Sequence, residues 1–298
     1  MNNEGPNNIV YRPPVECESL LLEVSEGCSY GKCTFCRCSA AGQLFCLCPW
    51  EQVERDLLEI RASGTLNKRI FLAGGNVFAF KSDMLLDLFD IIKRYLPFVQ
   101  EFSMYARATD ILNKDTEQLL ELKAQGLSTL YVGVESGSDK FLQDCKKGVS
   151  TAQMRKAFEI LDTLGIPYGL SCIIGLGGKG TAVEAANATA AFLNWLAPQS
   201  LRLMRLTPIE GTQLFKRVEE GTFICQGEKE SLMEEYLLLQ KLEFKGKECL
   251  FVANHLSNLV PMVGYLPKRK LEMLKILEEA IANIEKGVKI NPRSNTQW

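Results

Sequence analysis

Short apolar runs alternate along the chain with longer segments whose apolar residues recur at helical spacing. The short runs predict strands, and the longer segments predict helices. The predicted strands are residues 19–24, 69–73, 101–106, 130–134, 167–174 and 200–206. The predicted helices between them are residues 50–62, 84–95, 116–125, 151–164 and 182–196. Such alternation is typical of an α/β fold, in which a parallel sheet is wrapped by helices.

Signals at the helix ends support these boundaries. Ser150 and Gln153 have the spacing of a capping box at the start of one predicted helix, and Gly165 lies where that helix ends. Gly126 and Pro97 follow two other predicted helices, and both residue types stop helices. The pattern therefore predicts six strand–helix units before residue 215.

Beyond residue 215 the alternation stops, and the pattern predicts helices at residues 229–242 and 268–286. Their long apolar stripes favour packing against the preceding part of the chain. We therefore divide the chain into a strand–helix core, residues 1–215, and a helical C-terminal extension, residues 216–298.

A polar island lies inside apolar sequence between these two helices, at residues 249–261. It contains Asn254, His255 and Asn258. Polar side chains in apolar surroundings need partners, so the segment predicts a substrate-binding site with His255 as a candidate catalytic residue. The alternative is structural, with these side chains satisfying buried backbone groups in a loop.

Glycine and polar clusters follow the ends of the predicted strands. In this class of fold the functional residues gather at the carboxyl ends of the strands. The clusters are residues 28–36, Gly74-Gly75-Asn76, residues 105–110, Glu135-Ser136, residues 175–178 and Thr207-Pro208. A single glycine after a strand is usually only a turn, but clusters after every strand predict a common site.

The composition limits the class of protein. With 298 residues, 46% of them hydrophobic, the chain can bury a full-size core. It has no long uninterrupted apolar run and no signal-peptide pattern, so a cytoplasmic protein that does not bind membranes is expected. The net charge of -2 and the pI near 5.8 disfavour a large nucleic-acid surface. The 11 cysteines indicate reduced thiols and metal ligation.

Three cysteines, Cys28, Cys33 and Cys36, are close together just after the first predicted strand. An iron-sulfur cluster of the ferredoxin type takes four thiolates, so three would leave one iron able to bind another ligand. The alternative is zinc, which four Cys or His ligands usually hold. A further cysteine could complete such a set: Cys38, Cys46 or Cys48. The spacing favours iron and sulfur, because zinc ribbons usually have two evenly paired knuckles and the one histidine is distant.

The cysteine loop and the order of elements resemble the radical S-adenosylmethionine enzymes over roughly residues 15–215. The commonest motif of that family has three residues between its first two cysteines. This chain has four, a C-x4-C-x2-C variant that keeps an aromatic residue, Phe35, before the last cysteine. The resemblance implies a partial (β/α)6 TIM-like barrel with a helical C-terminal extension. It also implies two cofactors, a 4Fe-4S cluster on Cys28, Cys33 and Cys36 and S-adenosyl-L-methionine at the open iron.

The resemblance implies further cofactor-binding residues. Gly74-Gly75-Asn76 corresponds to the family's Gly-Gly-Glu motif, whose backbone receives the methionine amino group, with Asn76 in place of the acid. Glycine suits such a close approach of ligand to backbone. The other implied contacts are Phe35 near the adenine, Arg107 at the methionine carboxylate, Glu135 and Ser136 beside the ribose, Ile174 in the fifth-strand motif and Thr207 at the adenine edge.

The residues themselves leave alternatives open. Arg107 could face solvent, and Glu135 could cap the following helix. Ile174 and Thr207 could be ordinary core and turn residues. The remaining cysteines of the region could supply an auxiliary cluster or pack as small hydrophobes.

By resemblance, the activity is reductive cleavage of S-adenosylmethionine to a 5'-deoxyadenosyl radical that abstracts hydrogen from a small or medium metabolite. The implied partners are that substrate and a reductant such as flavodoxin or ferredoxin. Two other functions stay open. One is the modification of tRNA or of a peptide, and the other is a noncatalytic iron-sulfur or zinc protein.

Overall fold

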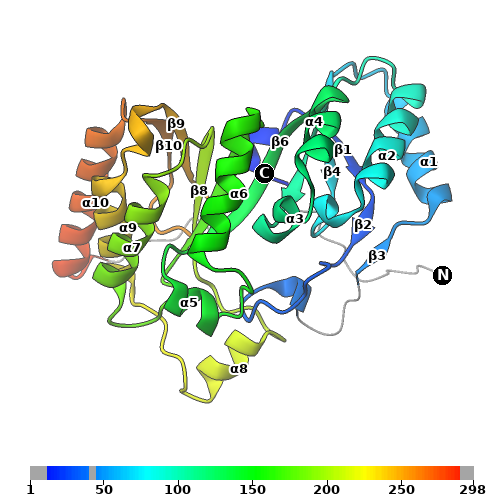
Figure 1. Ribbon diagram of the computed structural model, residues 1–298. Coiled ribbons are helices and arrows are strands. Elements are labelled where there is room, and N and C mark those ends of the chain that lie inside the picture. Colours follow the sequence, from blue (N-terminus) through cyan, green and yellow to red (C-terminus); the bar gives the residue numbers. More distant parts are fainter. Residues whose placement is uncertain (1–11, 40–44, 289–298) are drawn as a thin grey trace. The chain divides into compact units, whose positions relative to one another are not determined.

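The computed structural model describes residues 12–39 and 45–288 (Figure 1). The chain divides into two compact units. The first unit is Met1–Gly31 with Gln43–Tyr131, and the second is Lys32–Gly42 with Val132–Trp298. Strand β6, Leu127–Glu135, continues from the first unit into the second.

The first unit contains the first strands of the sheet and their helices. Its strands are β1 (Leu20–Glu23), β2 (Ser25–Glu26), β3 (Cys46–Leu47), β4 (Arg69–Ala73), β5 (Glu101–Ala106) and the start of β6. Its helices are α1 (Trp50–Ala62), α2 (Ser82–Tyr95), α3 (Ala108–Leu112) and α4 (Thr116–Ala124), with short 3-10 turns at η1 (Pro14–Glu16) and η3 (Val77–Ala79). β1 pairs with β4 and β4 with β5 in parallel, while β2 and β3 form a separate antiparallel pair.

The second unit continues the sheet from the end of β6. Its further strands are β7 (Tyr168–Ile174), β8 (Ser200–Arg205), β9 (Cys249–Ala253) and β10 (Met262–Leu266). Its helices are α5 (Asp139–Asp144), α6 (Thr151–Leu164), α7 (Ala182–Leu193), α8 (Gln213–Glu219), α9 (Glu228–Lys241) and α10 (Lys270–Glu285), with 3-10 turns at η2 (Arg37–Ser39) and η4 (Phe244–Gly246). Helix α9 packs against both α7 and α10, and the three lie side by side in Figure 1.

The eight-stranded sheet has the order β1-β4-β5-β6-β7-β8-β9-β10. β7, β8 and β9 pair in parallel, and β10 pairs antiparallel with β9. The predicted α/β class with a largely parallel sheet is therefore confirmed. Because consecutive strands are neighbours and parallel, the carboxyl ends of β4, β5 and the start of α3 share one edge of the first unit.

Every predicted helix and strand forms, and the bounds lie within three residues of the prediction. Helix α1 and strands β4 and β5 match the prediction at both ends. The capping box at Ser150 forms, since its side chain accepts from the Gln153 N–H, and Gly165 ends α6 in the left-handed region with φ 60°.

The segment beyond residue 215 differs from the prediction in one respect. Helices α9 and α10 form as expected, but the polar island between them is a hairpin of β9, a turn and β10 rather than a loop between helices. β9 also extends the sheet by pairing with β8. Its alternating pattern was hidden because nearly every residue of Cys249–Ala253 is buried, which gives a continuous apolar run. The division near residue 215 stays a prediction.

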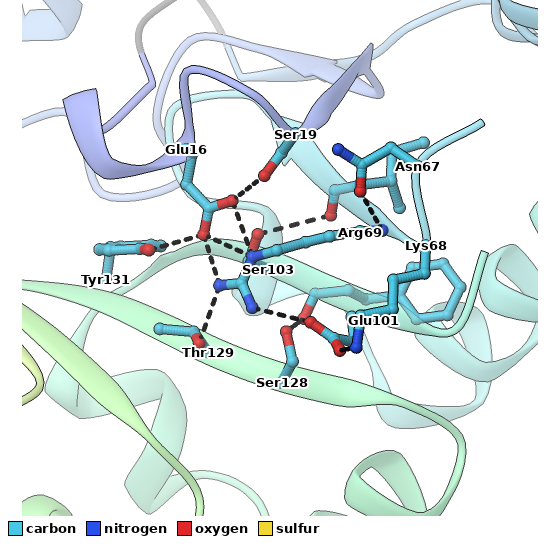
Figure 2. A network of polar contacts seen from close by, with 12 residues as sticks. Glu16, Ser19, Asn67, Lys68, Arg69, Glu101, Ser103, Ser128, Thr129 and Tyr131 are labelled. Carbon is cyan, nitrogen blue, oxygen red and sulfur yellow. Dashed lines mark hydrogen bonds and ion pairs between the residues drawn. The ribbon is translucent and has the colours of Figure 1, made fainter. Parts of the chain in front are cut away.

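A polar network ties the amino ends of the strands together in the first unit (Figure 2). Arg69 Nε donates to the Glu16 carboxylate at 2.9 Å, and the Tyr131 hydroxyl donates to the same carboxylate at 2.6 Å. Burial opposes the charge of Glu16, but hydrogen bonds led by that from Arg69 outweigh it and hold the pKa of Glu16 below its ordinary value. The network lies where the strands begin, so it supports the fold at the edge away from the predicted site.

No helix in the described part of the chain is long and apolar enough to cross a membrane.

Candidate cofactor and substrate site

The glycine pair after β4 is packed tightly against the start of the cysteine loop. A Cβ on Gly75 would lie 1.9 Å from the backbone oxygen of Gly27 and 3.1 Å from the Cα of Cys28. Gly74 has φ 148°, and its Cβ would lie 2.1 Å from Ser25 Oγ. Both positions therefore need glycine because neighbouring protein fills the space. This reason differs from the predicted one, in which the ligand itself approaches the glycine.

Asn76, the next residue, is 1% exposed and is held by two hydrogen bonds. Its Nδ2 donates to Ser29 Oγ and to Asp110 Oδ2, each at 2.8 Å. Its Oδ1 is buried and has no hydrogen-bond partner among the described residues. A buried acceptor without a partner costs about 1–3 kcal/mol, so this oxygen is suited to receive a donor from a ligand.

Arg107 lies at the end of β5, beside the same asparagine. Its guanidinium carbon is 3.6 Å from the centre of the Tyr30 ring, a cation–π contact. Its backbone N–H donates to Asp110 Oδ2 at 3.3 Å at the start of α3. Arg107 is half-buried rather than directed away from the protein. The residues brought together in the first unit are thus Ser29, Tyr30, Asn76, Arg107 and Asp110.

The later part of the cysteine loop is bonded into the second unit. The Thr34 N–H donates to the Cys145 carbonyl at 2.9 Å, and the Leu214 N–H donates to the Thr34 carbonyl at 2.9 Å. Phe35 packs against an apolar cluster that includes Ile173 and Leu206, at the ends of β7 and β8. The backbone on both sides of Thr34 is therefore fixed, which holds the positions of Cys33 and Cys36.

None of the cysteines in the described part of the chain forms a disulfide, and Cys28, Cys33 and Cys36 are half-buried. Cys36 hydrogen-bonds Cys38, and this bond together with burial raises the pKa of Cys36 well above its ordinary value. Among the described residues, no group of three or more His, Cys, Asp or Glu side chains is gathered as a metal site. The assignment of the three thiols as cluster ligands thus stays a prediction, which their chemistry fits because thiolates are the ligands of iron-sulfur clusters.

Glu135 ends β6 in an unusual conformation, with φ 64° in the left-handed region. Its carboxylate accepts a hydrogen bond of 2.8 Å from Lys147 Nζ. A Cβ on Gly133 would lie 2.3 Å from Glu135 Oε1 and 2.8 Å from Lys147 Nζ, so only glycine leaves room for this ion pair. Ser138, not Glu135, is the N-cap of the following helix α5. The carboxylate raises the pKa of nearby thiols, Cys36 among them, after the larger effects of the Cys38 bond and burial.

The remaining predicted cofactor contacts have local roles. Ser136 is buried, and its Oγ accepts from the Ser138 N–H at 3.2 Å. Ile174 is the buried last residue of β7, and its carbonyl accepts from the Leu206 N–H at 2.9 Å. Thr207 is exposed just past β8. These positions lie at strand ends, as predicted, and their ligand contacts stay predictions.

The turn between β9 and β10 holds the predicted substrate residues. His255 is the second residue after β9, and the Asn258 N–H donates to the His255 carbonyl at 2.9 Å. His255 Nδ1 lies 2.8 Å from Ser257 Oγ and accepts from the Ser257 N–H at 3.2 Å. Asn254 is half-buried, and Asn258 is 7% exposed. The turn lies at the carboxyl end of β9, next to the end of its parallel neighbour β8.

Three residues that shape the surroundings of Asn76 and Glu135 were not predicted from the sequence. Asp110 lies inside a polar cluster that was noticed but not assigned. Lys114 is buried, and its Nζ donates to the carbonyls of Phe78 and Phe80 at 3.0 and 2.8 Å, which holds the turn after Asn76. Lys147 had no signal of its own, because a lysine after a helix is usually exposed.

The family model described as "Radical SAM superfamily" matches residues 22–193 of the chain, more than half of its length. A provisionally named methylthiotransferase of Methanocaldococcus jannaschii is 26% identical over 160 residues, 52% of this chain and 35% of that protein. A tRNA uridine(34) acetyltransferase of Methanocaldococcus infernus is 26% identical over 120 residues, 40% of this chain and 22% of that protein. The chain thus spans only a minor part of the length of these two relatives.

Among solved structures, methylornithine synthase is similar with a TM-score of 0.53 and 15% identity. The match covers 90% of this chain and 85% of that one. The likeness shows the fold, the partial barrel that the sequence predicted, with its C-terminal helix.

Proposed function

Because the chain belongs to the radical S-adenosylmethionine superfamily, we propose that it cleaves S-adenosylmethionine reductively and acts on a small or medium metabolite. Members of this superfamily use a 4Fe-4S cluster with S-adenosylmethionine and need a substrate and a reductant. When bound, these two cofactors supply a radical that removes a hydrogen atom from the substrate. The residues of this chain bind and orient the cofactors and shield them from water.

The three thiols of Cys28, Cys33 and Cys36 are the proposed cluster ligands. Their support is chemical and local: each is half-buried, and none forms a disulfide. The backbone bonds of Thr34 fix the segment that carries two of them. A three-cysteine set leaves the fourth iron for the amino acid end of S-adenosylmethionine.

The unpartnered Oδ1 of Asn76 is the observation that carries the proposed binding site for S-adenosylmethionine. It lies at the end of β4, where the superfamily resemblance assigns the methionine amino group. Asn76 has no charge, but an amide oxygen accepts a hydrogen bond from an ammonium group. Asp110, bonded to the same side chain, supplies a negative charge close by.

Other residues bind the carboxylate, the ribose and the adenine of S-adenosylmethionine. Arg107, held over Tyr30, binds the methionine carboxylate through its guanidinium donors. Glu135 binds the ribose hydroxyls through its second carboxylate oxygen, with Ser136 beside it. Phe35, Ile174 and Thr207 line the adenine end, which agrees with the packing of Phe35 on the apolar cluster at the ends of β7 and β8.

The test is anaerobic reconstitution followed by iron analysis and an assay for 5'-deoxyadenosine. The wild type should hold about four irons per chain and release 5'-deoxyadenosine with a strong reductant. The variants Cys28→Ala, Cys33→Ala and Cys36→Ala should lose the cluster. Cys225→Ala is the matched control, since this thiol is half-buried in the apolar cluster instead. A normal cluster spectrum in Cys33→Ala would refute the ligand assignment.

The modification of tRNA is a second candidate, favoured by the name of one relative, the tRNA uridine(34) acetyltransferase. The net charge of -2 weighs against it. The two candidate functions are distinguished by adding either metabolite pools or total tRNA to the reconstituted protein, with flavodoxin or ferredoxin as the reductant. Stimulation of 5'-deoxyadenosine release by tRNA alone would favour the second.

A further inference from the structure

The turn between β9 and β10 holds its histidine by a directed chain of hydrogen bonds. The Arg205 backbone N–H, at the end of β8, donates to Ser257 Oγ at 3.1 Å. The same oxygen, Ser257 Oγ, lies 2.8 Å from His255 Nδ1. The Ser257 backbone N–H donates to the same Nδ1 at 3.2 Å. The bond from the backbone N–H requires a lone pair on Nδ1, so the Ser257 hydroxyl is the donor in the 2.8 Å contact.

This pattern assigns the tautomer of His255. An acceptor Nδ1 carries no proton, so the ring is neutral and its proton is on Nε2. No described residue hydrogen-bonds Nε2. The ring therefore presents an N–H donor, held in a fixed direction, at the carboxyl edge of the sheet in the second unit.

The electrostatic surroundings agree with a neutral ring beside positive charge. Burial, and then the charge of Arg202, lower the pKa of His255 below its ordinary value. Arg202 lies on β8, paired in register with Val252 of β9. A neutral donor next to a cation favours an oxygen acceptor with negative charge and disfavours an ammonium group.

A second, independent observation comes from the same turn. Asn258 is 7% exposed, and both its Nδ2 and its Oδ1 are buried without a hydrogen-bond partner among the described residues. Buried polar groups are nearly always paired. A side chain with two unpaired atoms therefore points to a ligand that completes it.

We propose that this turn is the substrate-binding element of the enzyme and that it selects a substrate bearing a carboxylate, whose oxygen accepts from His255 Nε2–H beside Arg202. Asn258 binds a further polar group of the same substrate. His255 is thus a hydrogen-bond donor and not a general base. This inference rests on the proposed function for the identity of the site, and it narrows the substrate class.

The tautomer is testable directly, since His255 is the one histidine of the chain. Full-length protein without a histidine tag, labelled with 15N-histidine, should give the long-range 1H–15N pattern of a neutral Nε2–H ring at neutral pH. Ser257→Ala removes one of the two donors to Nδ1 and should raise the population of the Nδ1–H form, whereas Ser257→Thr, which keeps the hydroxyl, should give the wild-type pattern. An Nδ1–H or doubly protonated ring in the wild type overturns the proposal.

The ligand class is tested on the same signal with three probes of equal length, propionate, propionamide and propylammonium. Propionate should shift the ring resonances most and propylammonium least. Arg202→Met should weaken the apparent affinity for propionate about tenfold, while Arg155→Met, whose arginine lies over Trp195, should leave it unchanged. Equal shifts from propylammonium, or no shift from any probe, overturn the proposal.

These measurements need no turnover, so they fail separately from the proposed function. A wild type with no cluster and no cleavage of S-adenosylmethionine would refute the proposed function. A working cleavage activity with the wrong tautomer would refute only the role of the turn.

Discussion

Lys147 Nζ lies 2.8 Å from Glu135 Oε1, and each of the two side chains is 9% exposed. The pair joins the end of β6 to the segment after α5, and it accompanies a left-handed φ of 64° at Glu135. A left-handed conformation costs a residue with a side chain about 1–2 kcal/mol. The ion pair and the absence of a side chain on Gly133 hold the carboxylate in place despite this cost.

Breaking the pair should therefore destabilise the fold. Lys147→Met leaves the Glu135 carboxylate buried without its cation, and we expect a loss of about 3–5 kcal/mol in the free energy of unfolding. Urea titration measures this loss in the free energy of unfolding. Lys146→Met is the matched control, because the Lys146 side chain is exposed. This substitution should change the free energy of unfolding by about 0.5 kcal/mol or less. Equal losses in the two variants would contradict a special role for the pair.

Gly75→Ala should disturb the cysteine loop as well as the cofactor pocket. Its Cβ would meet the backbone oxygen of Gly27 at 1.9 Å, so the segment leading to Cys28 must move. We expect a lower iron content after reconstitution together with weaker binding of S-adenosylmethionine. Gly227→Ala is the control, since its Cβ would meet no atom within 4 Å. A full iron content in Gly75→Ala would show that the loop adapts.

Asp110→Ala should weaken S-adenosylmethionine binding without removing the cluster. The substitution removes the acceptor that orients Asn76 Nδ2, so Asn76 Oδ1 loses its fixed direction. We expect about a tenfold loss of affinity by calorimetry on reconstituted protein, equal to about 1.4 kcal/mol. Asp110→Asn keeps an acceptor oxygen and should recover most of that loss. If both variants bind as tightly as the wild type, Asp110 does not position Asn76.

Glu235→Gln should stabilise the protein increasingly as the pH rises. Burial, and then the charge of Glu234, raise the pKa of Glu235 to about 8. The unfolded chain releases this proton near pH 4.5 and the folded chain keeps it, so wild-type stability falls as the pH rises between these values. The advantage of the variant should grow by roughly 2–4 kcal/mol from about pH 5 to about pH 8. Glu228→Gln, exposed on the same helix, is the control. If the difference in stability between Glu235→Gln and the wild type stayed constant across this pH range, the raised pKa of Glu235 would be contradicted.

The elements with local signals could be predicted from the sequence. Helix α1 and strand β4 have the bounds that their periodicity predicts, and the capping box at Ser150 forms between residues one helical turn apart. The superfamily and its cofactors were likewise predictable, because the cysteine motif and the order of elements are properties of the linear chain.

The partners of the site residues could not be predicted, because they come from distant parts of the chain. Asn76 bonds Asp110 from 34 positions away, and Gly175 donates to Glu234 across 59 positions. Neither the pairing of β9 with β8 nor the burial of Glu235 follows from the spacing of residues along one element. Periodicity reports which face of a helix or strand is apolar, but it carries no information on which distant backbone or side chain that face meets. That choice is made when the elements pack together.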